Sequence, residues 1–181
     1  MDCDFIKSLT SDQKADLRKL LDEDEVVSKS AKKYEFTGKT ISHGSHTLHQ
    51  IRRLSDGRVG GYIEFEENLS HEGNCWVDGN ARVYGKAQVY DNALVYDNAL
   101  VYDDARVYGD AWIYGNAWVY GDARISDRAR VFGKALVYDD AQVCGKAWVY
   151  DDAQVYGKAQ VHGVQVFGST LAYGNAIICG R

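Results

Sequence analysis

A six-residue phrase recurs without a break through most of the chain and limits the folds open to it. In "ALVYDNALVYDDARVYGDAWIYGNAWVY" each unit reads small residue, any residue, aliphatic residue, aromatic residue and two turn residues. The aliphatic slot is filled fifteen times in succession from Val77 to Val161, and the small slot is Ala in every unit except the one that begins at Cys75. Such a strict period is typical of a solenoid, in which each repeat packs on its neighbours.

The spacing inside one unit predicts a short strand followed by a tight corner. The small and aliphatic slots lie two residues apart, so both side chains point to one face of an extended strand, and β-branched Val favours that conformation. Pairs such as Gly85-Lys86 and Asp91-Asn92 fill the turn slots. Gly, Asn and Asp tolerate the positive φ of a tight corner. Three units close one triangular coil, and stacked coils form a parallel β-helix.

The same register extends beyond the perfect part of the repeat. Counting back by six fills the aliphatic slot with Val59, Phe65 and His71, with Ile63 and Leu69 at the paired inward slots, so coiling is expected to start near Gly61. Counting forward, one residue is missing after His162. The phase then resumes at Val166, Ala172 and Ile178. The sequence therefore predicts an all-β solenoid of six to seven triangular coils over residues 63–181.

Two other segments precede the coils. The stretch "LTSDQKADLRKLLDED" has Thr10 and Gln13 at capping-box spacing and leucines on one side, which predicts a short α-helix within residues 1–30. The stretch "KYEFTGKTISHGSHTLHQIRRL" alternates apolar and polar residues and predicts strands within a cap at residues 31–62. Either segment could cover the open end of the solenoid.

The repeat resembles the hexapeptide-repeat family of left-handed parallel β-helices. The unit Val83-Tyr84-Gly85-Lys86-Ala87-Gln88 fits the aliphatic and small slots of that family, although Tyr84 stands where the family usually has a small residue. The resemblance implies a left-handed coil. The segments KYEFTG, HTLHQIRRL and VGGYIEFEENLSHEGNCWV further resemble a bacterial and prophage branch without assigned activity, which implies a phage or mobile-element setting.

Composition narrows the partners and the compartment. The formal net charge of -5 argues against a broad nucleic-acid-binding surface. The four cysteines are widely spaced and form no CxxC pair, which favours a reducing compartment. Neither a signal peptide nor a run of about 18 apolar residues is visible, so we expect a cytoplasmic protein that does not contact a membrane.

The period of three units assigns every outward residue to one of three faces. One face receives Trp76, Leu94, Trp112, Arg130 and Trp148, a second receives Arg82, Leu100, Trp118, Leu136 and Gln154, and a third receives Gln88, Arg106, Arg124, Gln142 and Gln160. All four tryptophans fall on two faces, and stacked exposed aromatics indicate an interface. The predicted interface residues are Trp76, Trp112, Trp118, Trp148, Tyr96, Tyr114, Phe132, Tyr150, Leu100, Leu136 and Arg130. We expect self-association as a dimer or trimer, and a second protein as partner.

Enzymatic activity is weighed against this binding role. The family resemblance implies acyltransferases that use an interface histidine as general base and interrupt the coils with a loop. No insertion occurs between Val77 and Val161, so we favour a non-catalytic scaffold that binds and inhibits a host protein, with no catalytic residue and no cofactor. The alternatives are an acyltransferase that uses acyl-CoA with His162 or His71, and a binder of small ligands or glycans on the Trp ladder.

Three groups of possible metal ligands are judged insufficient, and no metal site is predicted. His43, His46 and His49 are split by strand geometry. The outward column Cys144, His162 and Cys179 is linear rather than tetrahedral, so a metal or reactive-thiol role is the lesser interpretation. A corner column is formed by Asp103, Asp104, Asp122, Asp139 and Asp140. We interpret it as turn chemistry, with a cation site or phosphate mimicry as the alternative.

Overall fold

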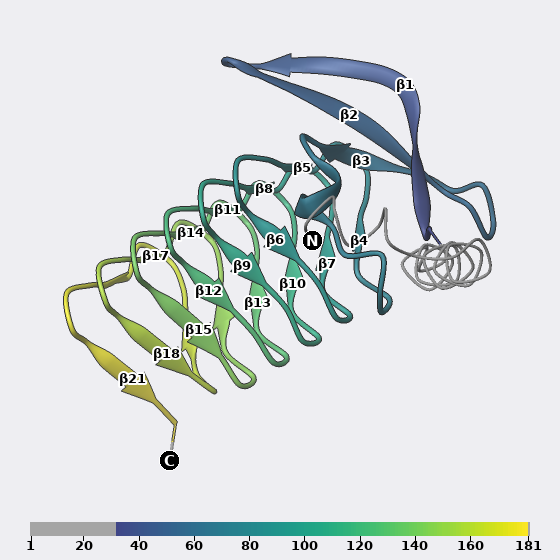
Figure 1. The fold of residues 1–181 in the computed structure, drawn as a ribbon. Helices are drawn as coiled ribbons and strands as arrows, with labels where there is room; N and C mark the ends of the chain where they lie inside the picture. The colour runs from purple at the N-terminus through teal and green to yellow at the C-terminus, as the bar shows by residue number, and fades with distance from the viewer. Residues whose placement is uncertain (1–31, 181) are drawn as a thin grey trace, which may run out of the picture. The chain divides into compact units, whose positions relative to one another are not determined.

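The described part of the chain is a stack of short strands wound around one core. A computed structural model describes residues 32–180. The helix predicted within residues 1–30 lies outside them. Residues 33–181 cluster as one compact unit, and Figure 1 shows its coils stacked side by side from β4 to β21. The only helical element among the described residues is the short 3-10 helix η1 (Glu66–Asn68).

Three sheets form the sides of the solenoid. Sheet A has the order β1 (Tyr34–His43), β2 (His46–Arg53), β3 (Val59–Ile63), β5 (Arg82–Val83), β8 (Leu100–Val101), β11 (Trp118–Val119), β14 (Leu136–Val137), β17 (Gln154–Val155) and β20 (Leu171–Ala172). Sheet B has β6 (Gln88–Val89), β9 (Arg106–Val107), β12 (Arg124–Ile125), β15 (Gln142–Cys144), β18 (Gln160–His162) and β21 (Ile177–Cys179). Sheet C has β4 (Trp76–Val77), β7 (Leu94–Val95), β10 (Trp112–Ile113), β13 (Arg130–Val131), β16 (Trp148–Val149) and β19 (Gln165–Val166).

The pairing confirms the three predicted faces. On sheet C, Trp112 pairs in parallel with Leu94 on one side and with Arg130 on the other. On sheet B, Arg124 lies in the same register between Arg106 and Gln142. Each strand therefore meets its equivalent one coil away, and outward residues form straight rows along the stack. The left-handed sense of winding stays a prediction.

The core consists of the small and aliphatic slots of every unit. From Ala81 to Val161 these side chains are between 0% and 1% exposed. At the corners the chain turns through positive φ, at Gly133 with φ 72° and at Asp127 with φ 57°. Adding a Cβ to Gly133 would bring it within 2.8 Å of the backbone nitrogen of Asp151 in the next coil. Close stacking of the corners therefore favours residues that need little room.

The first coil departs from the predicted register. Ile63 pairs with Val83, and Leu69 bridges to Val89. The residues of each pair are 20 positions apart in the sequence, whereas paired residues in the regular coils are 18 apart. The aliphatic slots are thus filled by Ile63 and Leu69, whereas Val59 and Phe65 are 51% and 50% exposed. Counting back by six was wrong here because the corner before Cys75 holds two extra residues. The missing residue after His162 is confirmed, since Val149 pairs with Val166.

The β1–β2 hairpin covers the N-terminal end of the coils. This is one of the two arrangements that the sequence left open. Sheet A continues from β5 through β3 into the antiparallel pair β2 and β1 (Figure 1). Tyr34 is fully buried, and its hydroxyl lies 3.0 Å from the carbonyl oxygen of Glu66 and 2.9 Å from that of Leu69. Ile51 packs in the same core cluster. The hairpin thus shields the first coil from water.

Candidate functional site

The outward row of sheet C contains two tryptophans that enclose one arginine. The guanidinium carbon of Arg130 lies 4.6 Å from the ring centre of Trp112 and 5.3 Å from that of Trp148. Trp148 is 36% exposed, and Trp112 and Arg130 are half-buried. A cation between two aromatic rings fixes both rings, because each contact contributes about 0.5–1 kcal/mol at an exposed site. The row therefore presents ordered aromatic surface to solvent.

A column of stacked rings runs beside this row. The ring centres of Tyr96 and Tyr114 are 4.9 Å apart and those of Tyr114 and Phe132 are 4.8 Å apart, with interplanar angles of 2° in both pairs. Tyr150 continues the stack at 4.9 Å from Phe132. Burial raises the pKa of the Tyr96 and Tyr114 hydroxyls above the ordinary tyrosine value. The row and column together form what we call the aromatic face: Leu94, Trp112, Arg130, Trp148, Tyr96, Tyr114, Phe132 and Tyr150.

Two residues predicted at the interface are buried within the chain. Trp76 is 3% exposed, because the guanidinium group of Arg53, from β2, lies over its ring at 4.4 Å and Tyr34 packs edge-on against it. Leu100 is 8% exposed on sheet A. The other two predicted residues of sheet A are accessible, since Trp118 is 44% exposed and Leu136 is half-buried. Sheet A therefore presents one isolated tryptophan, whereas sheet C presents a connected group.

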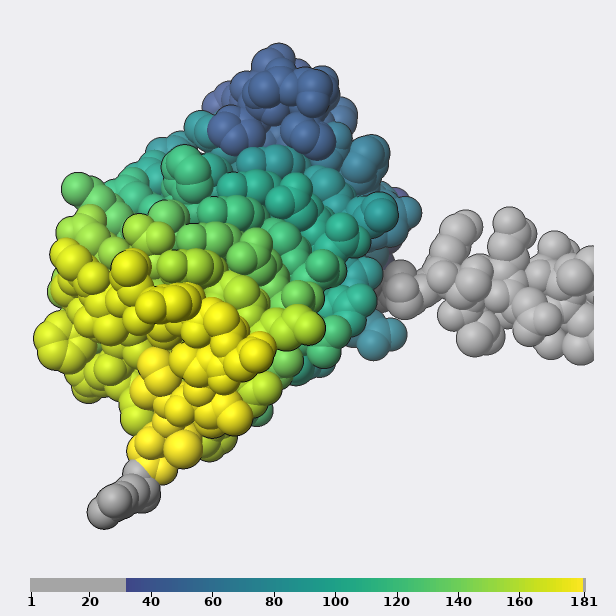
Figure 2. All heavy atoms as spheres, turned by 90° about the vertical axis from the view of Figure 1, so that its left-hand side faces the viewer, coloured from purple at the N-terminus to yellow at the C-terminus, as the bar shows by residue number. Residues whose placement is uncertain are grey.

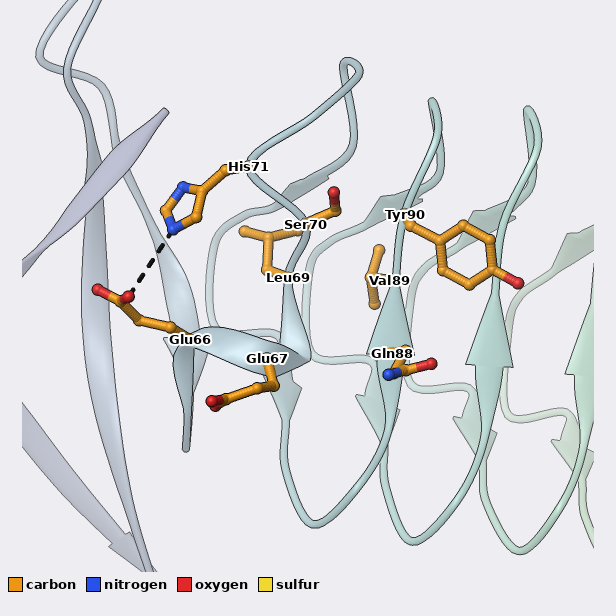
Figure 3. Close-up of a pocket in the computed structure, with 8 residues that line it drawn as sticks. All are labelled: Glu66, Glu67, Leu69, Ser70, His71, Gln88, Val89 and Tyr90. Carbon is orange, nitrogen blue, oxygen red and sulfur yellow. Dashed lines mark ion pairs between the residues drawn. The ribbon is translucent and has the colours of Figure 1, made fainter. Parts of the chain in front are cut away.

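A hollow of about 490 Å³ lies beside η1 at the start of sheet B (Figure 3). Tyr90, Gln88 and Glu67 border the hollow with accessible side chains, whereas Leu69 and Val89 lie beneath it in the core, at 0% and 1% exposed. His71 lines the hollow with its Nε2 at 3.9 Å from a carboxylate oxygen of Glu66. Figure 3 shows that the Tyr90 ring borders the hollow on the side of the following coils.

The two histidines named for acyl transfer are differently placed. His71 stacks on Tyr34 at 4.3 Å between ring centres, and its Nδ1 accepts a hydrogen bond of 3.2 Å from the backbone N–H of Lys33. That bond and the stack on Tyr34 tie the His71 ring to the start of the β1–β2 hairpin. His162 is exposed and lies in the sheet B column, with Nδ1 3.3 Å from the Cys144 sulfur.

The candidate metal ligands do not converge. Cys144, His162 and Cys179 form a straight column by strand pairing, and burial raises the pKa of the Cys144 thiol. His43 contacts the Arg82 side chain at 3.0 Å, whereas His46 contacts the Glu64 carboxylate at 2.9 Å. Among residues 32–180, no group of three His, Cys, Asp or Glu side chains could hold a metal ion.

The corner carboxylates have a structural role that the sequence pattern showed only in part. Asp103 and Asp139 adopt positive φ, and each accepts a hydrogen bond from a glycine backbone N–H in the next coil, at 3.3 Å from Gly121 and 3.1 Å from Gly157. Gly121 stands between the two aspartates in this column. The alternation of Asp and Gly at eighteen-residue spacing was the available signal in the sequence. Asp104, Asp122 and Asp140 occupy the following turn position and are exposed.

Comparison with known proteins agrees with this geometry. The family model of the YdcK beta solenoid repeat matches residues 87–103, 99–115 and 123–139. The chain is a β-solenoid repeat protein. No curated protein sequence matches it. The matched segments include Arg106, Trp112, Arg124 and Arg130, so the repeat similarity covers part of each candidate surface. Within residues 32–180, no helix is long and apolar enough to cross a membrane.

Proposed function

We propose that this β-solenoid is a non-catalytic binding scaffold that associates with other copies of itself, as a dimer or trimer, through the aromatic face. The observation that supports the proposal is the ordered group of Trp112, Arg130 and Trp148 beside the stacked column. Trp, Tyr and Arg are the residues that most often dominate the energy of protein interfaces. The rigid rows lose little conformational entropy when they bind, which favours association.

The aromatic face fits a protein surface better than a stacked sugar. A sugar or base binds to an open aromatic ring face, but Arg130 lies over both the Trp112 and the Trp148 rings. A protein partner can instead cover the row as a whole and bury its edges. Against the acyltransferase alternative, the described coils carry no inserted loop between Val77 and Val161, where that family interrupts its coils to shape an acceptor site.

The proposal is tested by light scattering on the Trp112→Ala, Trp148→Ala double variant, with Trp118→Ala as matched control on sheet A. We expect an oligomeric wild type, a double variant whose association is at least about thirtyfold weaker, and a control that stays oligomeric. Circular dichroism verifies that each variant keeps its strands. A monomeric wild type, or equal losses in the control, would refute self-association through this face.

We infer further that the chain belongs to the prophage branch of hexapeptide-repeat proteins and that it acts in the cytoplasm by binding and blocking a host protein. The support is the resemblance of residues 34–77 to that branch. Expression in a bacterial host tests this inference. Slowed growth with the wild type and normal growth with the Trp112→Ala, Trp148→Ala variant are expected, whereas equal growth with both would contradict it.

A further inference from the structure

Sheet B carries a row of exposed polar side chains that the aromatic face does not involve. The row consists of Gln88, Arg106, Arg124, Gln142 and Gln160, which are all exposed and lie in register along the stack. Adjacent members are about 4.8 Å apart at the backbone, as in any β-sheet. The row contains no acidic residue, so it is a strip of hydrogen-bond donors with two positive charges in a chain of net charge -5.

Arg106 and Arg124 differ from every other arginine within residues 32–180. They have no ion pair, no side-chain hydrogen bond and no ring contact there, although they are neighbours on paired strands. The other six described arginines each have a partner. Those pairs are Arg52 with Glu35, Arg53 with Asp56, Arg58 with Asp78, Arg82 with His43, Arg128 with Asp110, and Arg130 with Trp112 and Trp148.

Two like charges directly opposite each other on paired strands destabilise a sheet. An anion placed between the two guanidinium groups would remove the repulsion and use their free N–H donors, which match a carboxylate in a bidentate arrangement. The arrangement is therefore more favourable when bound to an anionic group than when free.

The arginine pair adjoins the apolar hollow of Figure 3. Tyr90, which lines the hollow, stacks on Tyr108 at 5.0 Å, and Gln88 precedes Arg106 in the row. Burial raises the pKa of the Tyr90 hydroxyl while Arg106 and Arg124 oppose that rise, so both positive charges act at this ring. An apolar recess and two free cations thus lie side by side on one face.

We propose that Arg106 and Arg124 bind the carboxylates of an acidic segment of a partner protein, whose neighbouring apolar side chain occupies the hollow and packs on the Tyr90 ring. A protein segment fits better than a nucleic acid, because a short acidic segment can place its carboxylates on the arginine pair alone. A continuous phosphate backbone would also run past the exposed carboxylates of Asp91 and Asp110 on the adjoining corner. This second binding surface does not depend on self-association through the aromatic face.

The sequence supplies a matched variant for the test. Glutamine already occupies the same slot in three coils of this row, so Arg106→Gln combined with Arg124→Gln removes both charges without disturbing the register. Arg128→Gln is the control, because Arg128 is also exposed but lies 4.0 Å from the Asp110 carboxylate. Light scattering on the double variant is expected to match wild type, which separates this test from that of the aromatic face.

The probe is a fluorescent oligo-glutamate peptide, followed by anisotropy at low and at high salt. We expect wild type and Arg128→Gln to bind it, the double variant to bind at least about tenfold more weakly, and added salt to weaken wild-type binding. A leucine-tipped version should bind more tightly to wild type, and Tyr90→Ala should reduce that gain. Absence of wild-type binding, equal binding by the double variant, or tighter binding of a single-stranded DNA oligonucleotide would overturn the proposal.

Discussion

Asp127 shows how a single corner residue connects two coils. Its backbone has φ 57°, and its carboxylate accepts a hydrogen bond of 2.8 Å from the backbone N–H of Gly145 in the next coil. Aspartate is suited to both tasks, because it tolerates left-handed φ and has a short acceptor side chain. Glycine would supply only the first of these properties, and alanine neither.

We therefore expect Asp127→Ala to lower the free energy of unfolding by about 1–3 kcal/mol, from left-handed strain and the lost hydrogen bond. Asp127→Asn keeps the acceptor and the conformational tolerance, so it should differ little from wild type. Asp127→Gly should fall between the two. Urea unfolding followed by circular dichroism ranks the variants, and an alanine variant as stable as the asparagine variant would contradict this role.

The tyrosine column of sheet A combines stacking with burial. Tyr84 is 8% exposed and stacks on Tyr102 at 5.0 Å with an interplanar angle of 1°. Burial raises the pKa of Tyr84 to about 12, and Asp103 adds to the rise. Burial also raises the pKa of Tyr102. The column therefore resists ionisation in the folded state, whereas in the unfolded chain each tyrosine ionises near pH 10.

This difference predicts how stability depends on pH. The stabilisation from Tyr84 is fully present below pH 10 and is lost as pH rises from 10 to about 12, because only the unfolded chain releases its proton in that window. Tyr84→Phe should make the decline in unfolding free energy shallower by up to about 1.4 kcal/mol per pH unit. Denaturant unfolding at several alkaline pH values measures both slopes, and identical slopes would refute the account.

Element by element, the regular coils follow from local sequence and the first coil does not. The slots from Val77 to Val161 could be assigned because every unit obeys one rule, and strand pairing at a fixed separation follows from it. The extra residues before Cys75 sit in a corner, where insertion leaves no periodic trace. The burial of Trp76 depends on Arg53, which is distant in the sequence and belongs to another element. Contacts between residues that are far apart in the sequence cannot be predicted from the repeat period.

The rows of the candidate surfaces could be predicted from the sequence. The side-chain contacts inside each row could be predicted only in part. The period placed Trp112, Arg130 and Trp148 in one row, but it could not show that Arg130 lies between the two rings. The repeat likewise aligned Arg106 with Arg124, but it could not show that neither forms an ion pair within residues 32–180. Side-chain choices of this kind depend on rotamers and on the corners nearby.

The two ends of the described solenoid differ in how their coils are covered. The first coil lies under the β1–β2 hairpin, whereas β19, β20 and β21 each pair on one side only within residues 32–180. Figure 2 looks onto this last coil, in yellow, and its atoms are open to view. Leu171 and Ile177 are 51% and 72% exposed there. In a solenoid each coil depends on its neighbours for stability, so this end should open first.

Hydrogen exchange measures that gradient. The backbone N–H of Trp118 donates to the Ala135 carbonyl in the next coil, and the equivalent groups of Leu171 and Ile177 have no such acceptor among the described residues. We expect the amides of Leu171 and Ile177 to exchange at least about tenfold faster than that of Trp118, because their exchange needs no opening of the stack. Uniform protection along the coils would mean that the β-solenoid unfolds as one cooperative unit.

The fixed register also governs how such a gene can change its length. Equivalent side chains recur once per turn of the prism, as in the pairing of Trp112 with Arg130. Duplication of a whole turn would lengthen the prism by about 4.8 Å and leave each row on its own side. Duplication of a single six-residue repeat would preserve strands and corners. It would nevertheless shift every later repeat from its own sheet to the next one, so neither the aromatic row nor the arginine row would stay on one face. A descendant protein that keeps both binding surfaces can therefore lengthen its solenoid only by multiples of three repeats.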